Sequence, residues 1–557
     1  MENLMAAHAW STKRVWTLAA MALLPCVAHA QVVLPGGVSA GQVNPSLQRE
    51  QIDAQQRQQQ VEERARRIEI PALQGAQPEQ GDALPSDSPP FVLSGISFNP
   101  SVFLTQTQLK DIAGQYVGRE ITFADLNDMI RQVNQLYTDG GQLTARAIIP
   151  PQSLEGGQLR VVLVEAKLDS VVFSGERQQV DESFYRDRIG LTEGETLDSP
   201  MLIEAIRRFN ATSQGPQLSA GLAPGERFGT TRVDLERFEP KRFDWSLFAN
   251  NYGSEGTGYE QLGGTFNWFS PTGVADNISA VLVGTRGSQY LNLRYTRPVT
   301  RSNGFAWVEA GANSMEIKRG PLADLNIEGD SSNYGLGFDQ PWWLSDRWLL
   351  LGGVGYTFQT SETTLEGVTL SEVDIQEVFL KGQFEYRAAP WYTRYEQRLR
   401  QASPDNALTG ESGNFTILTG DLYSSRQLGE AYELVGKAGW QYATRQDELP
   451  SALHKQFGGI SAQRGYEPGI ITAPWGVNAS VEGYWHLSER WQPFVFMDYG
   501  RAMELGDEDV DLISGGAGIN SRWWHDRVSA SLVVAGAFKD VVPDQDSGQV
   551  LLQLVFR

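Results

Sequence analysis

Short segments in which apolar and polar residues alternate fill the C-terminal part of the chain, from residue 242 onward. Between Tyr432 and Tyr442, for example, even positions are apolar or small, whereas Glu433 and Lys437 take odd positions. Because successive side chains of a strand point to opposite faces, this period of two predicts strands with one apolar and one mixed face. We expect these strands to cross an outer membrane, with lipid outside and water inside. Aromatic residues gather near the segment ends, as they do at membrane interfaces: Trp342, Trp343, Trp348, Trp391, Tyr392, Trp485, Trp491, Trp523 and Trp524.

The pattern allows sixteen strands, an even number as in bacterial outer-membrane barrels. The predicted fold class is therefore a membrane β-barrel of 16 antiparallel strands over residues 241–557. Beyond the N-terminus there is no uninterrupted apolar run of eighteen residues, which excludes a helical membrane protein. The segments lie near 242–251, 259–269, 277–286, 289–298, 304–314, 331–340, 346–358, 375–386, 391–400, 412–424, 430–444, 476–487, 491–501, 512–521, 526–538 and 548–557.

Residues 1–30 have the features of a secretory signal peptide. Lys13 and Arg14 precede an apolar run from Val15 to Ala28, and the run ends in Ala28-His29-Ala30. A basic stretch, a short apolar core and an A-x-A site predict cleavage after Ala30. A transmembrane anchor would need roughly twenty apolar residues, and the run has about fourteen.

A polar segment, 31–68, and a Pro-rich linker, 69–90, follow the signal. Asn44-Pro45 is a good helix start, and the residues up to 68 are rich in Gln, Glu and Arg with few apolar positions. This composition predicts a polar helix that cannot anchor a core of its own. Two interpretations stay open: a solvated helix or disordered spacer, or a plug helix lodged in a water-filled pore. The prolines of the linker predict an extended conformation.

Two copies of one pattern precede the barrel, at 91–166 and 167–240. Each reads strand, helix, helix, strand, strand, and the copies are about 77 residues apart, which indicates an internal repeat of a small α/β module. In the first copy, Thr122 and Asp125 form a capping-box pair at the start of the second helix. Leu126, Ile130, Val133 and Tyr137 form the apolar stripe of this helix.

Charge and composition exclude several classes of function. The net charge of −21 argues against a nucleic-acid partner. Cys26, the only cysteine, falls in the predicted signal, so neither a disulfide framework nor a thiolate metal site is expected. His454, His486 and His525 stand singly, without a second ligand at metal spacing. We therefore expect no catalytic residue, no cofactor and no metal.

One connection between predicted strands, about 445–475, is far longer than a usual hairpin loop. It contains Arg464-Gly465-Tyr466. The predicted strand at 491–501 has Phe494, Asp498 and Gly500 on the face opposite its lipid-facing residues. A carboxylate facing lipid would be costly, so Asp498 should point into the lumen, where Arg464 is its natural cationic partner.

The whole arrangement resembles the outer-membrane transporters of two-partner secretion (the TpsB family) within the Omp85 superfamily. The two α/β copies resemble POTRA modules, POTRA 1 at 91–166 and POTRA 2 at 167–240. Arg464-Gly465-Tyr466 matches the (V/I)-R-G-(F/Y) motif of the sixth loop, with Gln463 in place of the β-branched residue. Phe494…Asp498-x-Gly500 matches the barrel-wall motif F-x-x-x-D-x-G. The resemblance implies that loop 6 folds into the barrel and that Arg464 pairs with Asp498.

The resemblance also implies a function. The POTRA modules would capture an unfolded, TpsA-like exoprotein of the adhesin or haemolysin class in the periplasm. The exoprotein would then thread the barrel without ATP, after the plug helix leaves. Further partners would be outer-membrane lipid, the barrel-assembly machinery and periplasmic chaperones, and the chain would act as a monomer.

Three alternatives have distinguishable features. A barrel-assembly factor would normally carry more POTRA copies and no plug helix. A passive porin or uptake channel would not need two periplasmic repeats. A soluble periplasmic binding protein would partition into the aqueous fraction without detergent.

Overall fold

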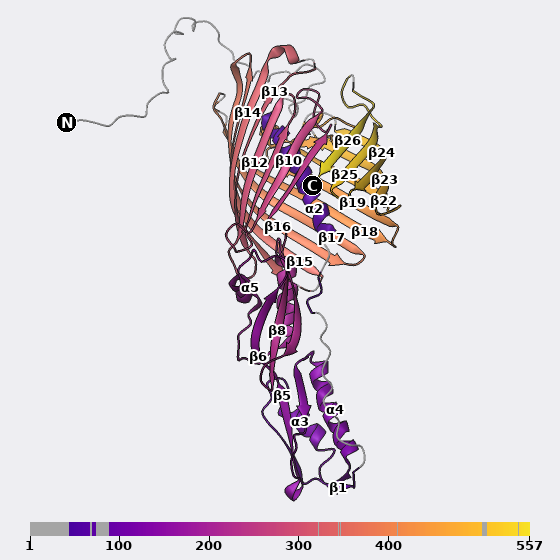
Figure 1. Cartoon of the computed structure of the whole chain (residues 1–557). Coiled ribbons are helices and arrows are strands. Elements are labelled where there is room, and N and C mark those ends of the chain that lie inside the picture. The colour runs from indigo at the N-terminus through magenta and orange to yellow at the C-terminus, as the bar shows by residue number, and fades with distance from the viewer. Residues whose placement is uncertain are drawn as a thin grey trace, which may run out of the picture.

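The computed structural model describes residues 44–66, 70–73, 88–320, 322–343, 345, 347–408, 410, 412–503, 509–543 and 545–557. The predicted signal peptide, 1–30, and most of the predicted linker, 69–90, lie outside the described residues. Figure 1 shows two small α/β modules stacked beneath a large barrel, with one helix, α2 (Pro45–Ala65), inside the ring of strands.

The first module begins with two short strands where the sequence predicted one. The fully buried Leu93 separates β1 (Phe91–Val92) from β2 (Gly95–Phe98), because β1 pairs with β3 (Glu120–Ile121) instead of continuing the main sheet. The main sheet has the order β2–β5–β4, with β2 parallel and β4 antiparallel to β5. The remaining elements are α3 (Gln106–Ala113), α4 (Phe123–Asp139), β4 (Ala145–Ile148), the 3₁₀ turn Glu155–Gly157 and β5 (Gln158–Glu165).

Helix α4 begins at the predicted capping box. The backbone N–H of Thr122 donates to Asp125 at 2.7 Å, and the Thr122 hydroxyl lies 2.9 Å from the same carboxylate. The buried stripe of the helix includes Met129, which is fully buried, whereas Ile130 is only partly buried. The stripe against the sheet therefore follows positions 126, 129, 133 and 137.

The second module repeats the topology of the main sheet and also has two helices between the first and second strands of that sheet. Its sheet has the order β6–β8–β7, with β6 parallel and β7 antiparallel to β8. The outer edge of β7 is already occupied, because the backbone N–H of Ala220 donates to the carbonyl of Ala72 in the predicted linker at 2.9 Å. The elements are β6 (Lys167–Ser174), α5 (Glu182–Ile189), α6 (Ser199–Thr212), β7 (Gln217–Pro224) and β8 (Thr230–Phe238).

The second module sits directly on two turns of the barrel. Phe269, the last residue of β10 (Gln261–Phe269) before the first of these turns, is buried in the hydrophobic core of the module. Arg188 of α5 reaches the second turn, where it donates to the Asn303 side chain at 2.9 Å and to the Thr300 carbonyl at 3.0 Å. The module and this rim of the barrel therefore share both apolar and polar contacts.

The barrel is closed and has sixteen antiparallel strands, which confirms the predicted barrel and its number of strands. β26 closes the barrel by pairing with β9 over four residue pairs. The strands are β9 (Phe243–Asn250), β10 (Gln261–Phe269), β11 (Asn277–Gly284), β12 (Ser288–Pro298), β13 (Phe305–Glu316), β14 (Ile327–Trp343), β15 (Trp348–Leu365), β16 (Val368–Ala388), β17 (Trp391–Asn406), β18 (Phe415–Leu428), β19 (Tyr432–Ala443), β22 (Trp475–Trp485), β23 (Trp491–Met503), β24 (Val510–Trp523), β25 (Val528–Ala537) and β26 (Gly548–Phe556).

Four central strands are longer than predicted. β14, β15, β16 and β17 have 17, 18, 21 and 16 residues, whereas the alternating pattern covers about ten per strand. These strands stay paired up to their ends, where Leu365 lies opposite both Ile327 and Val368. The backbone ladder therefore extends past the stretch in which apolar and polar residues alternate.

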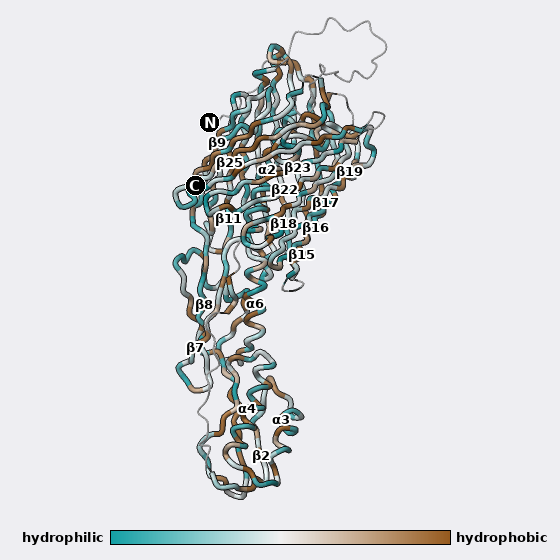
Figure 2. Tube along the Cα trace, turned by 90° about the vertical axis from the view of Figure 1, so that its right-hand side faces the viewer, coloured by the Kyte–Doolittle hydropathy of each residue, from teal (hydrophilic) through white to brown (hydrophobic). Residues whose placement is uncertain are grey.

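The two faces of the barrel strands differ as predicted. On β23, Val495 and Met497 are 63% and 58% exposed on the outer face, whereas Phe494 is 7% and Asp498 0% exposed on the inner face. Figure 2 shows hydrophobic and hydrophilic positions interspersed along the barrel strands. The outer face of β23 is therefore apolar at these positions, and its inner face carries the buried carboxylate of Asp498.

Helix α2 lies against the inner wall, and its contacts are mainly polar. Asn44 caps its start by accepting from the Ser46 N–H at 3.0 Å. Near that end the Ser46 hydroxyl bonds to Ser361 of β15 at 3.1 Å. Near the other end Arg64 pairs with Glu385 of β16 at 3.0 Å. Helix α2 therefore lies within the ring of strands, in contact with β15 and β16.

Within the part of the chain that the structure describes, no helix is both long and apolar enough to span a membrane.

Candidate functional site

The long connection between β19 and β22 folds back into the barrel. It leaves the barrel end that lies away from the α/β modules and forms a short hairpin of β20 (Lys455–Phe457) and β21 (Ile471–Ala473). The tip of this hairpin is buried, with Gln463 0%, Arg464 6% and Tyr466 1% exposed. The loop therefore presents the predicted motif to the inner wall instead of to solvent.

Arg464 is enclosed by the barrel wall and bonded through most of its polar atoms. Its backbone N and its Nε each lie 3.0 Å from Asp498 Oδ2, and its Nη2 lies 2.5 Å from Asp498 Oδ1. The guanidinium also stacks on Phe496, 3.6 Å from the ring centroid. Such a two-pronged arrangement of donors on a carboxylate fixes orientation as well as charge.

The barrel-wall motif supplies the receiving surface. Asp498 is fully buried and also lies 3.2 Å from the Ser514 hydroxyl. Phe494 stacks on Tyr484 with ring centroids 4.9 Å apart, on the same inner face. Phe494 thus contributes to the aromatic wall beside Arg464.

Gly465 and Tyr466 fix the tip against the next strands. A Cβ at Gly465 would lie 2.7 Å from the backbone of Gly536 on β25, so only glycine allows this approach. The Tyr466 hydroxyl lies 2.8 Å from the Lys539 carbonyl and accepts from the Ile513 N–H at 3.1 Å. The three motif residues therefore contact three different parts of the wall.

Gln463, where the resemblance expects a β-branched residue, forms polar contacts in place of apolar packing. Its Oε1 accepts from the Gly458 N–H at 3.0 Å, and its Nε2 donates to the Tyr499 carbonyl at 3.1 Å. Gly500 makes room for the amide, because a Cβ there would lie 2.6 Å from Nε2. The glycine of the wall motif and Gln463 are therefore complementary in shape.

The sequence reasoning missed Glu482 and Lys437. Glu482 of β22, 2% exposed, pairs with Arg464 Nη1 at 2.8 Å. Lys437 of β19 pairs with Glu482 at 3.2 Å and with Glu62 of helix α2 at 2.9 Å. Ser480, which accepts from Arg464 Nη2 at 2.7 Å, lies directly opposite Asp498 in the strand register. Knowing that register would have identified Ser480, and Glu482 two positions along the same face.

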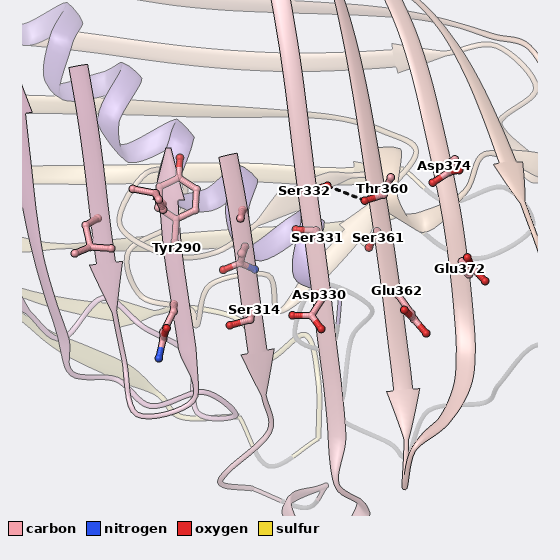
Figure 3. Close-up of a pocket in the computed structure, with 15 residues that line it drawn as sticks. Tyr290, Ser314, Asp330, Ser331, Ser332, Thr360, Ser361, Glu362, Glu372 and Asp374 are labelled. Atoms are coloured by element: carbon pink, nitrogen blue, oxygen red, sulfur yellow. Dashed lines mark hydrogen bonds between the residues drawn. The ribbon is translucent and has the colours of Figure 1, made fainter. Parts of the chain in front are cut away.

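A second group of charges lies apart from loop 6. Figure 3 shows the carboxylates of Asp330, Glu362, Glu372 and Asp374 on three neighbouring strands that line a cavity. Asp330, Glu362 and Glu372 are direct cross-strand partners, an unfavourable arrangement of like charges. No group of three or more His, Cys, Asp or Glu side chains among the described residues could hold a metal ion. The loop 6 cluster is therefore the stronger candidate site.

Comparison with known families agrees with this geometry. Residues 229–521, more than half of the chain, match the family described as haemolysin secretion/activation protein ShlB/FhaC/HecB. The chain belongs to this family. Residues 91–166 match the ShlB-type POTRA domain. As a ShlB/FhaC/HecB protein with a closed barrel, it resides in the outer membrane, and its POTRA domain lies in the periplasm.

Several curated relatives of this ShlB/FhaC/HecB protein are transporters. It is 27% identical to the outer membrane transporter CdiB of Dickeya dadantii (strain 3937) over 42% of its own length and 41% of that protein. It is 21% identical to the heme/hemopexin transporter protein HuxB of Haemophilus influenzae (strain ATCC 51907) over 74% of its own length and 77% of that protein. The hemolysin transporter protein ShlB of Serratia marcescens is 25% identical over 46% of each chain. The alignments to CdiB and ShlB thus span less than half of those relatives.

The solved structure of CdiB from Escherichia coli has the same fold. It superposes with a TM-score of 0.65 over 91% of this chain and 98% of that chain, at 18% identity. The similarity at this level of identity concerns the arrangement of barrel and periplasmic modules alone.

Proposed function

We propose that this chain exports a large, unfolded partner protein across the outer membrane by two-partner secretion. The observation that carries the proposal is a closed barrel of the ShlB/FhaC/HecB family with a polar lumen and a polar helix inside it. The transporter names of its relatives support the same class of activity. The action is non-enzymatic, because a threading pore needs a path and binding surfaces, and no bond is made or broken.

Helix α2 acts as the plug of this pore. Its contacts with the wall, such as Ser46 to Ser361 and Arg64 to Glu385, are hydrogen bonds and ion pairs that water can replace when the helix leaves. An apolar helix in the same place would lose buried surface on leaving. The polar sequence of α2 therefore favours an occupant that can be released.

Deleting residues 44–66 tests the plug. We expect the deletion to raise single-channel conductance in planar bilayers, because the lumen would be open to ions. A deletion protein with unchanged conductance would remove the plug role while leaving the export proposal to be tested separately.

The second α/β module, 167–240, is a second POTRA domain, and the repeated element order supports this. Together with POTRA 1 at 91–166, it receives the exoprotein in the periplasm. The outer strands β2 and β4 of the first module are sheet edges, and an extended chain can add to such an edge through backbone hydrogen bonds. Periplasmic chaperones deliver the exoprotein, the barrel-assembly machinery inserts the transporter into lipid, and one copy suffices for transport.

The pair of Arg464 and Asp498 holds loop 6 in one position at rest. The burial of both groups and their three polar contacts support a strong but breakable attachment. Water can replace the partners of an ion pair during transport. An apolar anchor of equal strength has no such replacement, so it would resist release. The segment at 445–475 would then move relative to the barrel wall as the exoprotein passes.

Co-expression with a candidate partner, a large exported protein from an adjacent reading frame, tests the export activity. We expect the exoprotein in the medium only when the intact transporter is present. Release of the exoprotein without the transporter would contradict the proposal. Loss of other outer-membrane proteins on deletion would instead indicate a barrel-assembly factor, and uptake of small solutes alone would indicate a passive channel.

A further inference from the structure

Five charged side chains form an unbroken chain of contacts from helix α2 to the barrel-wall motif. Glu62 of α2 pairs with Lys437 at 2.9 Å, and Lys437 pairs with Glu482 at 3.2 Å. Glu482 pairs with Arg464 at 2.8 Å, and Arg464 pairs with Asp498 at 2.5 Å. The five groups come from the helix, from loop 6 and from three wall strands. One ionic path therefore joins the plug to the loop.

The central members of this chain have little access to water. The Lys437 side chain is 17% exposed, and those of Glu482, Arg464 and Asp498 are 2%, 7% and 0% exposed. Because partly buried charges are poorly screened, each group depends on its partners for compensation. A change at one end should therefore be felt by the next group along.

The balance of charge depends on the helix. With α2 in place, the path contains three carboxylates and two cations, Lys437 and Arg464. Lys437 is shared by Glu62 and Glu482. When α2 leaves, Lys437 loses Glu62 and retains Glu482 as its acceptor within this row of charged groups. Glu482 also serves Arg464, so a stronger bond to Lys437 draws this carboxylate away from the loop.

We propose that Lys437 is a positioning residue that couples the plug helix to loop 6. In the resting state Glu62 satisfies Lys437, and Glu482 is available to hold Arg464. Departure of the helix redirects Lys437 to Glu482 and weakens the attachment of the loop. Coupling of this kind is reciprocal, so an undocked loop also loosens the helix. The proposal rests on the plug role of α2, since it gives that departure a consequence at the loop.

A cysteine reporter in the loop measures the coupling in the full-length protein. Ile470 is 4% exposed and belongs to an apolar cluster in which the loop packs against Ala502 and Leu512 of the wall, so Ile470→Cys reacts with a maleimide mainly when the loop undocks. We expect Glu62→Gln to raise the labelling rate about fivefold or more, because typical coupling free energies change an affinity by at least this factor. Glu63→Gln is the matched control, because Glu63 is the next residue of the helix and its side chain is 66% exposed and pairs with Arg557, which is not part of the ionic path.

Lys437 decides between coupling and a general loosening. In a Lys437→Met background Glu62→Gln should leave the labelling rate unchanged, whereas in a Lys437→Arg background the effect should return. Equal effects of Glu62→Gln with Lys437 and with methionine at that position would overturn the proposal, as would no effect in either. Heat-modifiable gel migration identifies variants whose barrel has failed to fold.

The labelling result is separate from the conductance test of the plug. Unchanged conductance after deletion of residues 44–66 would remove the plug role, even if Glu62→Gln loosens the loop. Raised conductance after the deletion, with no response of the loop to Glu62→Gln, would remove the coupling and leave the plug.

Discussion

Removing the charge of Asp498 should release loop 6 from the barrel wall. Asp498→Asn keeps the shape of the side chain but leaves Arg464 buried without the carboxylate that accepts three of its donors. Breaking a buried ion pair costs about 3–5 kcal/mol. Arg464 keeps Glu482 at 2.8 Å, so the lower end of this range applies.

A loss of about 3 kcal/mol corresponds to a roughly 100-fold larger open population, because each 1.4 kcal/mol is a factor of ten. The Ile470→Cys reporter converts this population into a labelling rate as long as opening and closing are faster than the reaction. Cys26 is the only cysteine in the sequence and falls in the predicted signal peptide, so the mature chain would carry no competing thiol. We therefore expect labelling about 100-fold faster in Asp498→Asn.

The control is another buried carboxylate of the inner wall. Asp339 is 2% exposed and pairs with Lys381 at 2.6 Å, away from the loop motif. Asp339→Asn should leave the labelling rate of the reporter within a few-fold of the parent. Equal rates in Asp498→Asn and Asp339→Asn would refute the assignment of Asp498 as the anchor of the loop.

Charge reversal gives an independent check, and Glu482 determines its design. Arg464→Asp combined with Asp498→Arg restores the opposite charges but leaves a carboxylate at position 464 beside Glu482. The reversed pair should therefore recover slow labelling only with Glu482→Gln added. Failure of this triple variant to recover, in a folded barrel, would argue against a direct pair.

Gln463 fits closely against Gly500, so Gly500→Ala should destabilise the docked loop by about 1–3 kcal/mol, the usual cost of overpacking. Adding Gln463→Ala should restore slow labelling of the reporter, and no recovery would contradict the fit. On the outer wall, Val495→Arg should cost about 2–4 kcal/mol in lipid, as for cations near the middle of a membrane strand, and unfolding titrations in vesicles that find no cost would contradict the orientation of β23. The hydrogen bonds from Thr122 lower the pKa of Asp125 below its usual value. The stabilisation by Asp125 is thus present above the unfolded-state pKa and lost as pH falls through the folded-state pKa, so hydrogen exchange in α4 should depend less on acidic pH in Asp125→Asn than in the parent.

Local patterns in the sequence determined the strands and their faces. Alternation of apolar and polar residues is a property of neighbouring positions, so it showed that Val495 faces lipid and that Asp498 cannot. A different local feature located Arg464. It lies in an unusually long connection and in a short motif, and both are visible without coordinates. The capping pair of Thr122 and Asp125 is equally local, since its two residues are three positions apart.

Contacts between distant segments could be decided only by the tertiary structure. The extra length of β14–β17 depends on cross-strand pairing outside the segments in which the sequence alternates. The position of α2 depends on many separate polar contacts with the wall. Polar contacts of this kind produce no apolar stripe in the sequence of the helix, so the sequence does not reveal them. Glu482 and Lys437 were missed for a related reason. Their importance comes from the registers that align β19, β22 and β23, and a register joins residues that lie far apart along the chain.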